Sequence, residues 1–494
     1  MQSQSPSRSK SVTGSARFEM HPRLRPLAAC VALAFAASAP AAGSGDSARH
    51  RGSGALHVSR LARGPGLTSA ANFTVNTCDD PLPLPSICPA GTTEGTLRLG
   101  LLCAHGGDTI DLSNLQCSTV TLNAPLTAPP VTLGLVGPSG GQLMIDAGGK
   151  FRAIVHKPPL YNNGPSLDGL YISNLTIANG RYDNPEPLAG YALGGCIYST
   201  GNVFLSDSTV SSCLASSPVR FSIVAGGAIY AKGKVSLYKS SVTDSKALGD
   251  NTGTGGASSS YGGGIYAHIV DLNRSTISGN TASSAAASAG GGMLAATVYA
   301  DYSTISGNQA RSGAGIYARR AYLSDSTVSG NHTPSDGLIG GVYARQVMDV
   351  SSCTIAGNTS GGTLAAGLFS GYSSPHLQNT IVANNMTDGV EFDVGTASGL
   401  PVLGSNNLIM VAKATTAVPD DTISADPLLG PLADNGGATR TQALLPGSPA
   451  IDKGKIVPGV AFDQRDFGRV VGAKPDIGAF EFDPDRVFGS GFDL

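Results

Sequence analysis

The central part of the chain repeats a short pattern of hydrophobic and polar positions. Six segments, such as VFLSDSTV at residues 203–210 and VDLNRSTI at 270–277, carry hydrophobic residues at their first, third and eighth positions. Because side chains alternate between the two faces of a strand, the first and third positions face one side. The eighth position starts a second short strand after a polar corner. The hydrophobic positions of this register are Val203, Leu205, Val210, Val235, Leu237, Val242, Val270, Leu272, Ile277, Val298, Ala300, Ile305, Ala321, Leu323, Val328, Met348, Val350 and Ile355, with Leu170, Ile172 and Ile177 in an earlier copy.

A Gly-rich segment with a further short strand precedes each of these units. Its hydrophobic position recurs every 23 to 36 residues, at Ile197, Ile229, Ile265, Met293, Ile316, Val342 and Leu368. Periods of this length are typical of solenoids. Three short strands per unit can bury their common face only when the units coil and stack, with a rise of about 4.8 Å per coil. The sequence therefore predicts an all-β fold, a right-handed parallel β-helix with three sheets, over residues 151–403.

Each unit ends in a turn that carries Gly and Asn. In Ser278-Gly279-Asn280 and its copies these residues suit positive φ angles. Stacking predicts a ladder in which side-chain amides hydrogen-bond from coil to coil. A loop of variable length follows the turn, longer at 281–289 than at 309–312, and we expect binding at such loops. The ladder residues are Asn280, Asn308, Asn331 and Asn358.

A tyrosine follows the hydrophobic residue of the Gly-rich segment in five coils. Since its neighbour points inward, each tyrosine should point outward, and stacking should align them along one sheet. Such a row could bind a glycan through ring faces and hydroxyls. It could instead stabilise the sheet as cross-strand aromatic pairs, worth about 0.2 to 1 kcal/mol each, and we favour this structural role. The row is Tyr198, Tyr230, Tyr266, Tyr317 and Tyr343.

Composition and charge narrow the class of protein. The 494 residues include 66 Gly and no Trp, and only 13% are charged, which argues against a helical solenoid. The net charge of -2 offers no basic field for nucleic acid. A basic n-region at Arg23-Leu24-Arg25 and an apolar run up to Ala42 predict a signal peptide over residues 1–42, followed by a flexible low-complexity linker at 43–71. We expect an exported protein with no membrane span once the signal is removed.

Cysteines cluster near the start of the exported chain. In an oxidising compartment, disulfides among them could staple a cap with a small core. We expect neighbouring cysteines to pair, and at least one of Cys196, Cys213 and Cys353 to stay unpaired. The spacings predict no metal site. The disulfide candidates are Cys78, Cys88, Cys103 and Cys117.

Several motifs resemble known families. The strings GGxIYA and STISGN resemble coils of bacterial surface β-helix proteins, including chlamydial polymorphic outer-membrane proteins. The strings DPLLGPLADNGG, PGSPAIDKG, DQRDFGR and PDIGAFEF resemble the choice-of-anchor Q domain of secreted bacterial proteins, over residues 404–482. The segment at 95–98 resembles the start of such proteins, where a short helix precedes the first coil. The resemblance implies an N-terminal helical cap with the first coils at 72–150, a C-terminal capping domain, and a sorting-like tail at 483–494.

Charged residues leave an enzymatic reading open. A pectate-lyase-like site needs carboxylates from adjacent coils to hold Ca²⁺, with an Arg or Lys as base. We weigh this against the preference of exposed turns for Asp, Asn and Ser, which we favour. For the acidic residues of the C-terminal motifs we expect turn formation and capping, with calcium as the alternative. The corner and nearby charges are Asp207, Lys239, Arg274, Asp325, Asp271, Asp301 and Asp349; the C-terminal residues are Asp434, Asn435, Asp452, Asp463, Asp476 and Glu481; and His268, His332 and His376 read as surface residues.

These observations predict a non-catalytic β-helix that is secreted or lies at the cell surface. Association with the outer membrane is one form of the second alternative. The expected role of the protein is adhesion or glycan recognition, with a polysaccharide or a cell-surface glycan as partner. The alternative is a lyase or glycoside hydrolase that acts on acidic polysaccharide. No catalytic residue, cofactor or metal ligand is assigned.

Overall fold

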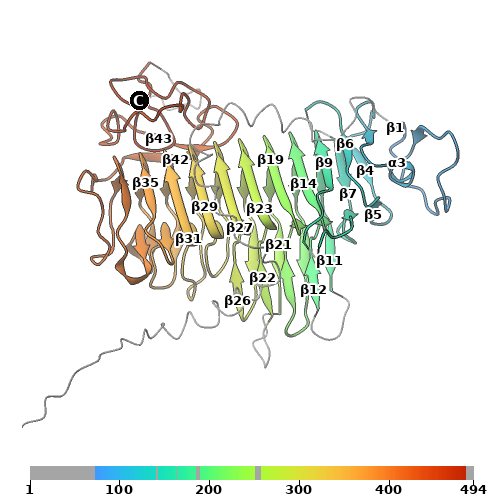
Figure 1. Cartoon of the computed structure of the whole chain (residues 1–494), viewed down its shortest axis with the longest axis horizontal. Coiled ribbons are helices and arrows are strands. Elements are labelled where there is room, and N and C mark those ends of the chain that lie inside the picture. The colour runs from blue at the N-terminus through green and yellow to red at the C-terminus, as the bar shows by residue number, and fades with distance from the viewer. Residues whose placement is uncertain (1–72, 141–142, 163, 185–189, 251–257, 486–494) are drawn as a thin grey trace, which may run out of the picture. The chain divides into compact units, whose positions relative to one another are not determined.

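The computed structural model describes residues 73–140, 143–162, 164–184, 190–250 and 258–485. The predicted signal peptide and linker lie outside the described residues, as does most of the predicted tail. The described chain forms the expected right-handed parallel β-helix, in which strands of successive coils pair side by side (Figure 1).

The largest sheet, sheet A, has 19 strands. In the early coils it takes two short consecutive strands from one coil, whereas four later coils each contribute a single strand of nine or ten residues. The strands are β1 (Phe73–Val75), β2 (Glu94–Gly95), β3 (Thr109–Asp111), β5 (Leu126–Ala128), β6 (Leu133–Val136), β8 (Ile154–His156), β9 (Gly169–Ser173), β13 (Ile197–Ser199), β14 (Asn202–Ser206), β18 (Ile229–Ala231), β19 (Lys234–Tyr238), β23 (Ile265–Asn273), β27 (Met293–Asp301), β29 (Ile316–Ser324), β31 (Val342–Ser351), β34 (Leu368–Ser370), β35 (His376–Gln378), β39 (Val394–Thr396) and β40 (Leu403–Ser405).

Sheet B has 11 strands and forms another long face of the coils. It pairs the eighth positions of the sequence units, so that Val242 lies beside Ile277 and Ile277 beside Ile305. Its strands are β4 (Thr119–Thr121), β7 (Leu143–Asp146), β10 (Leu175–Ala178), β15 (Thr209–Ser211), β20 (Ser241–Thr243), β24 (Thr276–Ser278), β28 (Thr304–Ser306), β30 (Thr327–Ser329), β32 (Thr354–Ala356), β36 (Ile381–Ala383) and β41 (Leu408–Ile409).

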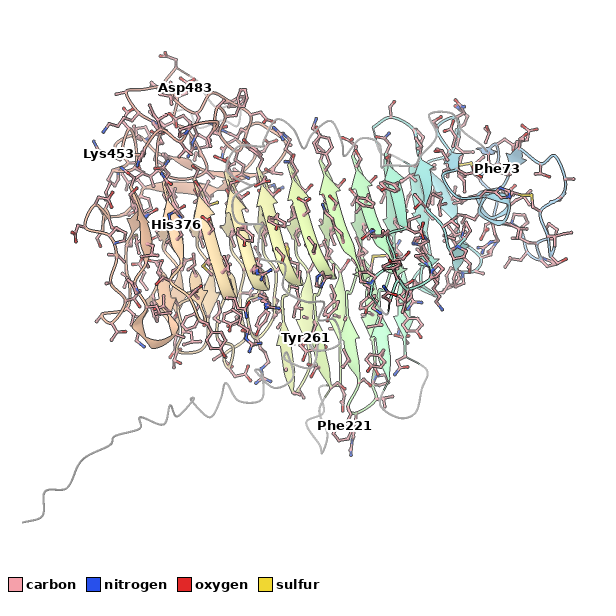
Figure 2. The ribbon with its side chains drawn as sticks, in the orientation of Figure 1. Phe73, Phe221, Tyr261, His376, Lys453 and Asp483 are labelled. Atoms are coloured by element: carbon pink, nitrogen blue, oxygen red, sulfur yellow. A yellow bond between two sulfur atoms is a disulfide. The ribbon has the colours of Figure 1, made fainter. Side chains whose placement is uncertain are left out.

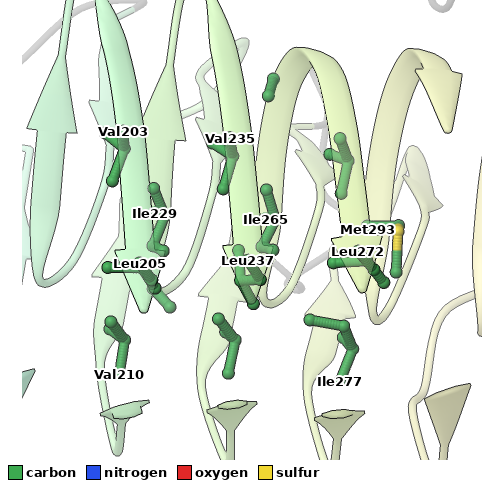
Figure 3. Packing of buried hydrophobic residues seen from close by; sticks show 14 of the residues in the cluster. Val203, Leu205, Val210, Ile229, Val235, Leu237, Ile265, Leu272, Ile277 and Met293 are labelled. Atoms are coloured by element: carbon green, nitrogen blue, oxygen red, sulfur yellow. The ribbon is translucent and has the colours of Figure 1, made fainter. Parts of the chain in front are cut away.

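The predicted register is confirmed in the core. Val203 pairs with Val235, and Leu205 with Leu237, while the Ile position runs from Ile229 to Ile265. These side chains point into the space between the sheets and are buried (Figure 3). Hydrophobic burial in this interior, at about 25 cal/mol per Å² of apolar surface, supplies the main driving force for stacking.

The corner between sheets A and B repeats one backbone conformation. A single residue per coil adopts a left-handed φ between 43° and 55°. Asn and Asp tolerate this region better than most residues, which explains their frequency at the corner. The residues are Asn174, Asp207, Lys239, Arg274, Tyr302, Asp325, Ser352, Asn379 and Asn406.

The longer inserts are strands and not the loops that we expected from their length. They form two parallel sheets of four strands each. The strands of one sheet follow the turn that carries Gly and Asn in the later coils, and the strands of the other precede the Gly-rich segment. We call the two sheets together the fin. Small side chains at Ala192, Ala215 and Ala247 pack with Val224 between the two sheets, which hydrophobic periodicity does not reveal. Phe221 lies at the tip of the fin (Figure 2). The strands are β11 (Arg181–Asp183), β16 (Leu214–Ser216), β21 (Lys246–Leu248) and β25 (Thr281–Ser283), and β12 (Tyr191–Leu193), β17 (Ile223–Ala225), β22 (Ser259–Tyr261) and β26 (Ala287–Ala289).

Helix α3 (Leu97–Cys103) is capped by Thr96, whose hydroxyl accepts a hydrogen bond from the Leu99 amide. It supplies the predicted helical cap over the first coils. Beside it, the Arg98 guanidinium binds the buried Asp80 carboxylate through Nε and Nη2, at 2.7 and 2.6 Å.

The neighbour pairing predicted for the N-terminal cysteines is wrong. Cys78 pairs with Cys117, and Cys88 pairs with Cys103. Strand β1 pairs with both β2 and β3, so the segment after β1 folds back toward residues distant in sequence. Cys196 and Cys213 form a third disulfide. The buried Cys353 has a free thiol, as expected for at least one of the later cysteines.

The C-terminal region, residues 410–485, covers the end and the side of the coils. Ala412 and Val418 pack against the last part of the core. The chain then returns along the outer face of sheet B, where Ala479 N donates to Thr354 Oγ1 and Thr327 Oγ1 donates to Gln464 Oε1. Its strands β42 (Leu429–Ala433) and β43 (Thr441–Leu444) pair antiparallel. The last coils add the antiparallel pair β37 (Met386–Thr387) and β38 (Val390–Glu391), and β33 (Thr359–Ser360) pairs parallel with β37. They also contain the short 3-10 helix η1 (Ala397–Gly399).

Candidate functional site

The outer face of sheet A carries the predicted tyrosine row. The rings of Tyr198, Tyr230 and Tyr266 stack in parallel, with centroids 5.5 and 5.4 Å apart. Leu294 takes the next position, and the row resumes with Tyr317 and Tyr343, whose centroids lie 4.6 Å apart. Phe369 ends it, 6.3 Å from Tyr343. All five predicted tyrosines therefore share one line.

The stacking limits what the tyrosine row can offer a ligand. The faces of its inner rings are occupied by their neighbours, and Tyr317 is only 5% exposed. Burial raises the pKa of Tyr230 to about 12, and it raises that of Tyr266 further. Only ring edges and hydroxyls are left for contact. This geometry favours the cross-strand structural role for the row, whereas its role in binding stays a prediction.

A second aromatic row lies on the other half of the same face. Tyr171 stacks on Phe204 with centroids 4.3 Å apart, and Tyr299 stacks on Tyr322 at 5.1 Å. We did not predict this row, although Phe204, Tyr299 and Tyr322 all occupy the second position of the repeated eight-residue unit. The period of two, applied to the outward positions, would have found it.

Between the two aromatic rows runs a line of basic residues, which we call the basic row. Each member lies two residues after a position of the tyrosine row. Arg319 thus follows Tyr317 and Ala318, and Arg345 follows Tyr343 and Ala344. Ala318 and Ala344 pair across adjacent coils. Arg319 Nε donates to Gln346 Oε1 at 2.5 Å. Burial and the charge of Arg319 lower the pKa of His268. The basic row is Lys157, Lys232, His268, Arg319 and Arg345, with Arg320 exposed beside it.

Two exposed tyrosines flank the tyrosine row. Tyr191 on β12 of the fin is 63% exposed, and it contributes to the raised pKa of Tyr230. Tyr372, after β34, is 62% exposed, with the Arg345 guanidinium 5.3 Å from its ring centroid. Unlike the inner members of the row, these rings keep open surface. They were absent from our sequence-based candidates because neither occupies a repeated position.

The predicted asparagine ladder is present inside the coil stack. Asn280 Nδ2 donates to Asn308 Oδ1 at 3.0 Å, and the same bond joins each later pair. Each amide also donates to a backbone carbonyl, as Asn308 does to Ile277. The ladder continues to Asn385 and ends at Asp393, whose carboxylate accepts from Asn385 at 2.8 Å. These asparagines are fully buried, so their role is structural.

The corner charges do not gather into one site. Asp325 is buried beside Arg469 of the C-terminal region, and Arg274 forms an ion pair with Asp466. The remaining nearby carboxylates also have local partners: Asp271 binds Lys234, Asp349 binds His376, and Asp301 accepts from Ser324. Asp207 is exposed and accepts from Ser206. These contacts support the turn interpretation of the corner over a pectate-lyase-like site.

The acidic residues of the C-terminal motifs act as caps and turn acceptors. Asp476 accepts from the amides of Asp452 and Phe482, and Glu481 accepts from those of Val471 and Asp476. Further bonds of the same kind run from Gly436 N to Asp434, from Lys474 N to Asp452, and from Arg465 N to Asp463, while Asn435 donates to the Thr441 carbonyl. Within the described residues no cluster of three or more His, Cys, Asp or Glu side chains is suited to a metal ion.

One buried pair has the chemistry of a catalytic site but no access. His156 Nδ1 lies 3.0 Å from Ser199 Oγ, and His156 Nε2 lies 2.9 Å from the Val131 carbonyl oxygen. Both side chains are fully buried inside the first coils. The pair therefore satisfies buried polar groups.

Comparisons with known proteins concern the fold. No protein-family model and no curated protein matches the sequence. Among solved structures, the chain is similar to a crystal structure of the pectate lyase Pel9A, at 10% sequence identity and a TM-score of 0.42, over 85% of this chain and 99% of that one. A likeness at this level carries no argument about activity. Across the part of the chain that the structure describes, no helix is long and apolar enough to cross a membrane.

Proposed function

We propose that the protein is a non-catalytic, exported glycan-binding β-helix whose binding face is the outer face of sheet A. The observation that carries the proposal is the arrangement of this face, where a basic row lies between two aromatic rows. Tyrosine hydroxyls and ring edges suit sugar hydroxyls, and the open rings of Tyr191 and Tyr372 suit the apolar faces of sugars.

Export is supported by the cysteine chemistry. Three disulfides in one chain are typical of proteins that fold in an oxidising compartment. The C-terminal motifs support a relationship to choice-of-anchor Q proteins of the bacterial surface, and the coils a relationship to polymorphic outer-membrane proteins. We propose adhesion at the cell surface, or in the surrounding matrix, as the setting of the glycan contact.

Replacing the exposed tyrosines tests the binding face. In Tyr191→Ala and Tyr372→Ala we expect at least a fivefold loss of affinity for the polysaccharide that the wild type retains best in affinity electrophoresis, because an open aromatic contact is lost. Phe221→Ala, an equally exposed aromatic at the fin tip, should bind like the wild type. Retention of no polysaccharide by the wild type, or equal losses in all three variants, would refute the proposal.

Substitutions in the tyrosine row test whether it stabilises the sheet or binds the glycan. Tyr266→Leu removes a stacked ring, and we expect the free energy of unfolding to fall by about 0.5 to 1 kcal/mol. Tyr266→Phe keeps the ring and should unfold like the wild type. Urea titration followed by circular dichroism measures both. Unchanged stability in Tyr266→Leu together with loss of polysaccharide binding would show that the row serves recognition instead.

A further inference from the structure

Half of the twelve arginines that the structure describes form ion pairs. These six pair with aspartates and are Arg98, Arg181, Arg274, Arg311, Arg465 and Arg469. In contrast, Arg319, Arg320 and Arg345 form no ion pair with any described residue. These three lie together on the outer face of sheet A, on the adjacent strands β29 and β31. The outer face of sheet A therefore holds three guanidinium groups close together that form no ion pair with a described carboxylate.

The contacts of the three arginines hold them without neutralising them. The Gln346 side-chain oxygen accepts from Arg319 Nε, and the Tyr372 ring lies under the Arg345 guanidinium. Both partners are uncharged, so each guanidinium keeps its charge. Arg319 keeps the N–H groups of its two Nη atoms for a ligand. A guanidinium presents these donors in a fork that matches the two oxygens of a carboxylate or sulfate.

The charge continues along the coil axis. Ala318 pairs with Ala344, so Arg319 and Arg345 lie in adjacent coils, which are about 4.8 Å apart. In earlier coils the same line carries Lys232 and Lys157, with Thr200 and Ala296 at this position in the coils between, and Lys157 Nζ lies 5.8 Å from the Tyr198 ring centroid. His268 also lies on the line, but its lowered pKa leaves it little positive charge at neutral pH. A linear polymer lying along this line would meet four cations, two of them in the adjacent coils of Arg319 and Arg345. Hydroxyls and ring edges of tyrosines would flank it.

We propose that the ligand of this face is an anionic polysaccharide, whose carboxylates or sulfates lie on the basic row, with Arg319, Arg320 and Arg345 as its main anion-binding site. This inference rests on the proposed glycan-binding function and names the class of glycan. The stacked rings of the tyrosine row have no free faces for bases, and the open rings of Tyr191 and Tyr372 stand apart from each other. The face therefore lacks the row of open rings on which successive bases stack, which favours a sugar polymer over a nucleic acid.

A pair of probes with one backbone tests the charge requirement. Polygalacturonate and its fully methyl-esterified form differ in carboxylate charge. We expect the wild type to bind polygalacturonate at least tenfold more tightly, with an affinity that falls as salt is raised from 0.05 to 0.5 M. Chondroitin sulfate and its desulfated form serve as the sulfated pair, and tighter binding to the sulfated form would identify sulfate as a preferred group of the same class.

Matched variants test the arginine site. Arg319→Gln, Arg320→Gln and Arg345→Gln combined should weaken binding to the preferred anionic polymer by at least tenfold. The control combines Lys453→Gln, Lys455→Gln and Lys474→Gln, which remove the same charge from exposed positions of the C-terminal region (Figure 2 labels Lys453), and should change binding less than twofold. Unfolding temperatures measured by circular dichroism should match the wild type in both, because all six side chains lie at the surface or half-buried.

The outcomes separate this inference from the proposed function. Equal binding of the two polygalacturonate forms, with the arginine variant unaffected and Tyr372→Ala impaired, would overturn the anionic ligand but keep glycan binding. Binding to no glycan would overturn both. Tighter binding to single-stranded DNA than to any polysaccharide, lost in the arginine variant, would overturn the assignment to polysaccharide.

Discussion

The coils and the C-terminal region pack against each other but are stabilised in different ways. In the coils one residue type repeats at one position, so Ile, Val and Leu fill the interior and asparagines stack into a ladder. In residues 425–485 the structure assigns only β42 and β43 as strands, and charged side chains are buried at single positions. The comparison shows that repetition supplies stability through many equal contacts, whereas a unique segment depends on a few specific ones.

The specific contacts of the C-terminal region centre on Arg465. Its guanidinium binds Asp463 through Nε and Nη2, at 2.8 and 2.6 Å, and lies 3.6 Å from the ring centroid of Phe480. Nη2 also donates to the Glu481 carbonyl. Asp463 accepts in turn from the amides of Phe467 and Glu481. Two segments of this region, 463–467 and 480–481, thus meet at one buried ion pair.

The largest expected effect is a charge inside the coils. Ile277 is fully buried on β24, between Val242 and Ile305. Ile277→Asp places a carboxylate there without a partner, and we expect a loss of more than about 4 kcal/mol, enough to prevent folding of the neighbouring coils. Circular dichroism during thermal unfolding measures it. Ile277→Val should cost only about 1 kcal/mol. A cooperative transition at the wild-type temperature in the Asp variant would contradict the register.

The coils could be predicted because their physics repeats. A period of two within strands and a recurring unit fixed which side chains face inward, and the asparagine ladder followed from stacking equal turns. Two ladder residues were not predicted. Asn385 belongs to an Ala-x-Asn turn that lacks the Gly, and Asp393 comes from the next coil. The fin was missed because Ala and Ser at Ala215, Ala247 and Ser260 give almost no hydrophobic period, although they let two sheets approach closely.

The C-terminal region and the candidate site were harder for a different reason. Nothing in the spacing of Asp463 and Arg465 says that both are buried, because burial depends on a long return of the chain over sheet B. For the site, the tyrosine row was predicted but its closed stacking was not, since ring orientation depends on packing. Arg319 and Arg345 were not predicted as site residues, because each is a single cation in its own strand. Only the alignment of adjacent coils brings the two together.

A smaller loss of stability, limited to the C-terminal region, is expected when Arg465 is replaced. Arg465→Ala leaves Asp463 charged and buried without its partner, which costs about 3 to 5 kcal/mol. We expect proteolysis to cleave residues 425–485 while the coils keep their unfolding temperature. Arg440→Ala, whose side chain is exposed in the same region, should resist the protease like the wild type. Simultaneous unfolding of coils and C-terminal region in the Arg465 variant would show that the two form one cooperative unit.

The smallest expected effect concerns the boundary between the two regions and depends on pH. Asp325 occupies the left-handed corner of its coil and faces Arg469, with 4.0 Å between Oδ1 and Nε; among the described residues Asp325 Oδ1 has no hydrogen-bond partner. Burial raises the pKa of Asp325 to about 7; the Arg469 charge opposes this, whereas Asp301 and Asp463 add to it.

The sign of the pH effect follows from the two states. Between the unfolded pKa of about 4 and the folded pKa, the native protein binds more protons than the unfolded chain, so the free energy of unfolding falls as pH rises. The contribution of Asp325 is fully present below about pH 4 and is lost as pH rises through 7, with a slope of at most about 1.4 kcal/mol per pH unit. Burial also raises the pKa of Glu481 to about 7 and that of Asp476, which adds to the trend.

Asp325→Asn isolates the part that belongs to the boundary. Asn fits the left-handed φ and cannot ionise, so we expect a flatter dependence between pH 5 and 8 and a variant more stable than the wild type at pH 8, by about 1 to 2 kcal/mol. Urea unfolding at each pH measures the slope. Asp207→Asn, at the equivalent but exposed corner, should leave the profile unchanged. A parallel profile in Asp325→Asn would mean that Arg469 keeps the Asp325 carboxylate charged throughout, and that an ion pair, instead of a neutral acid, joins the C-terminal region to the coils.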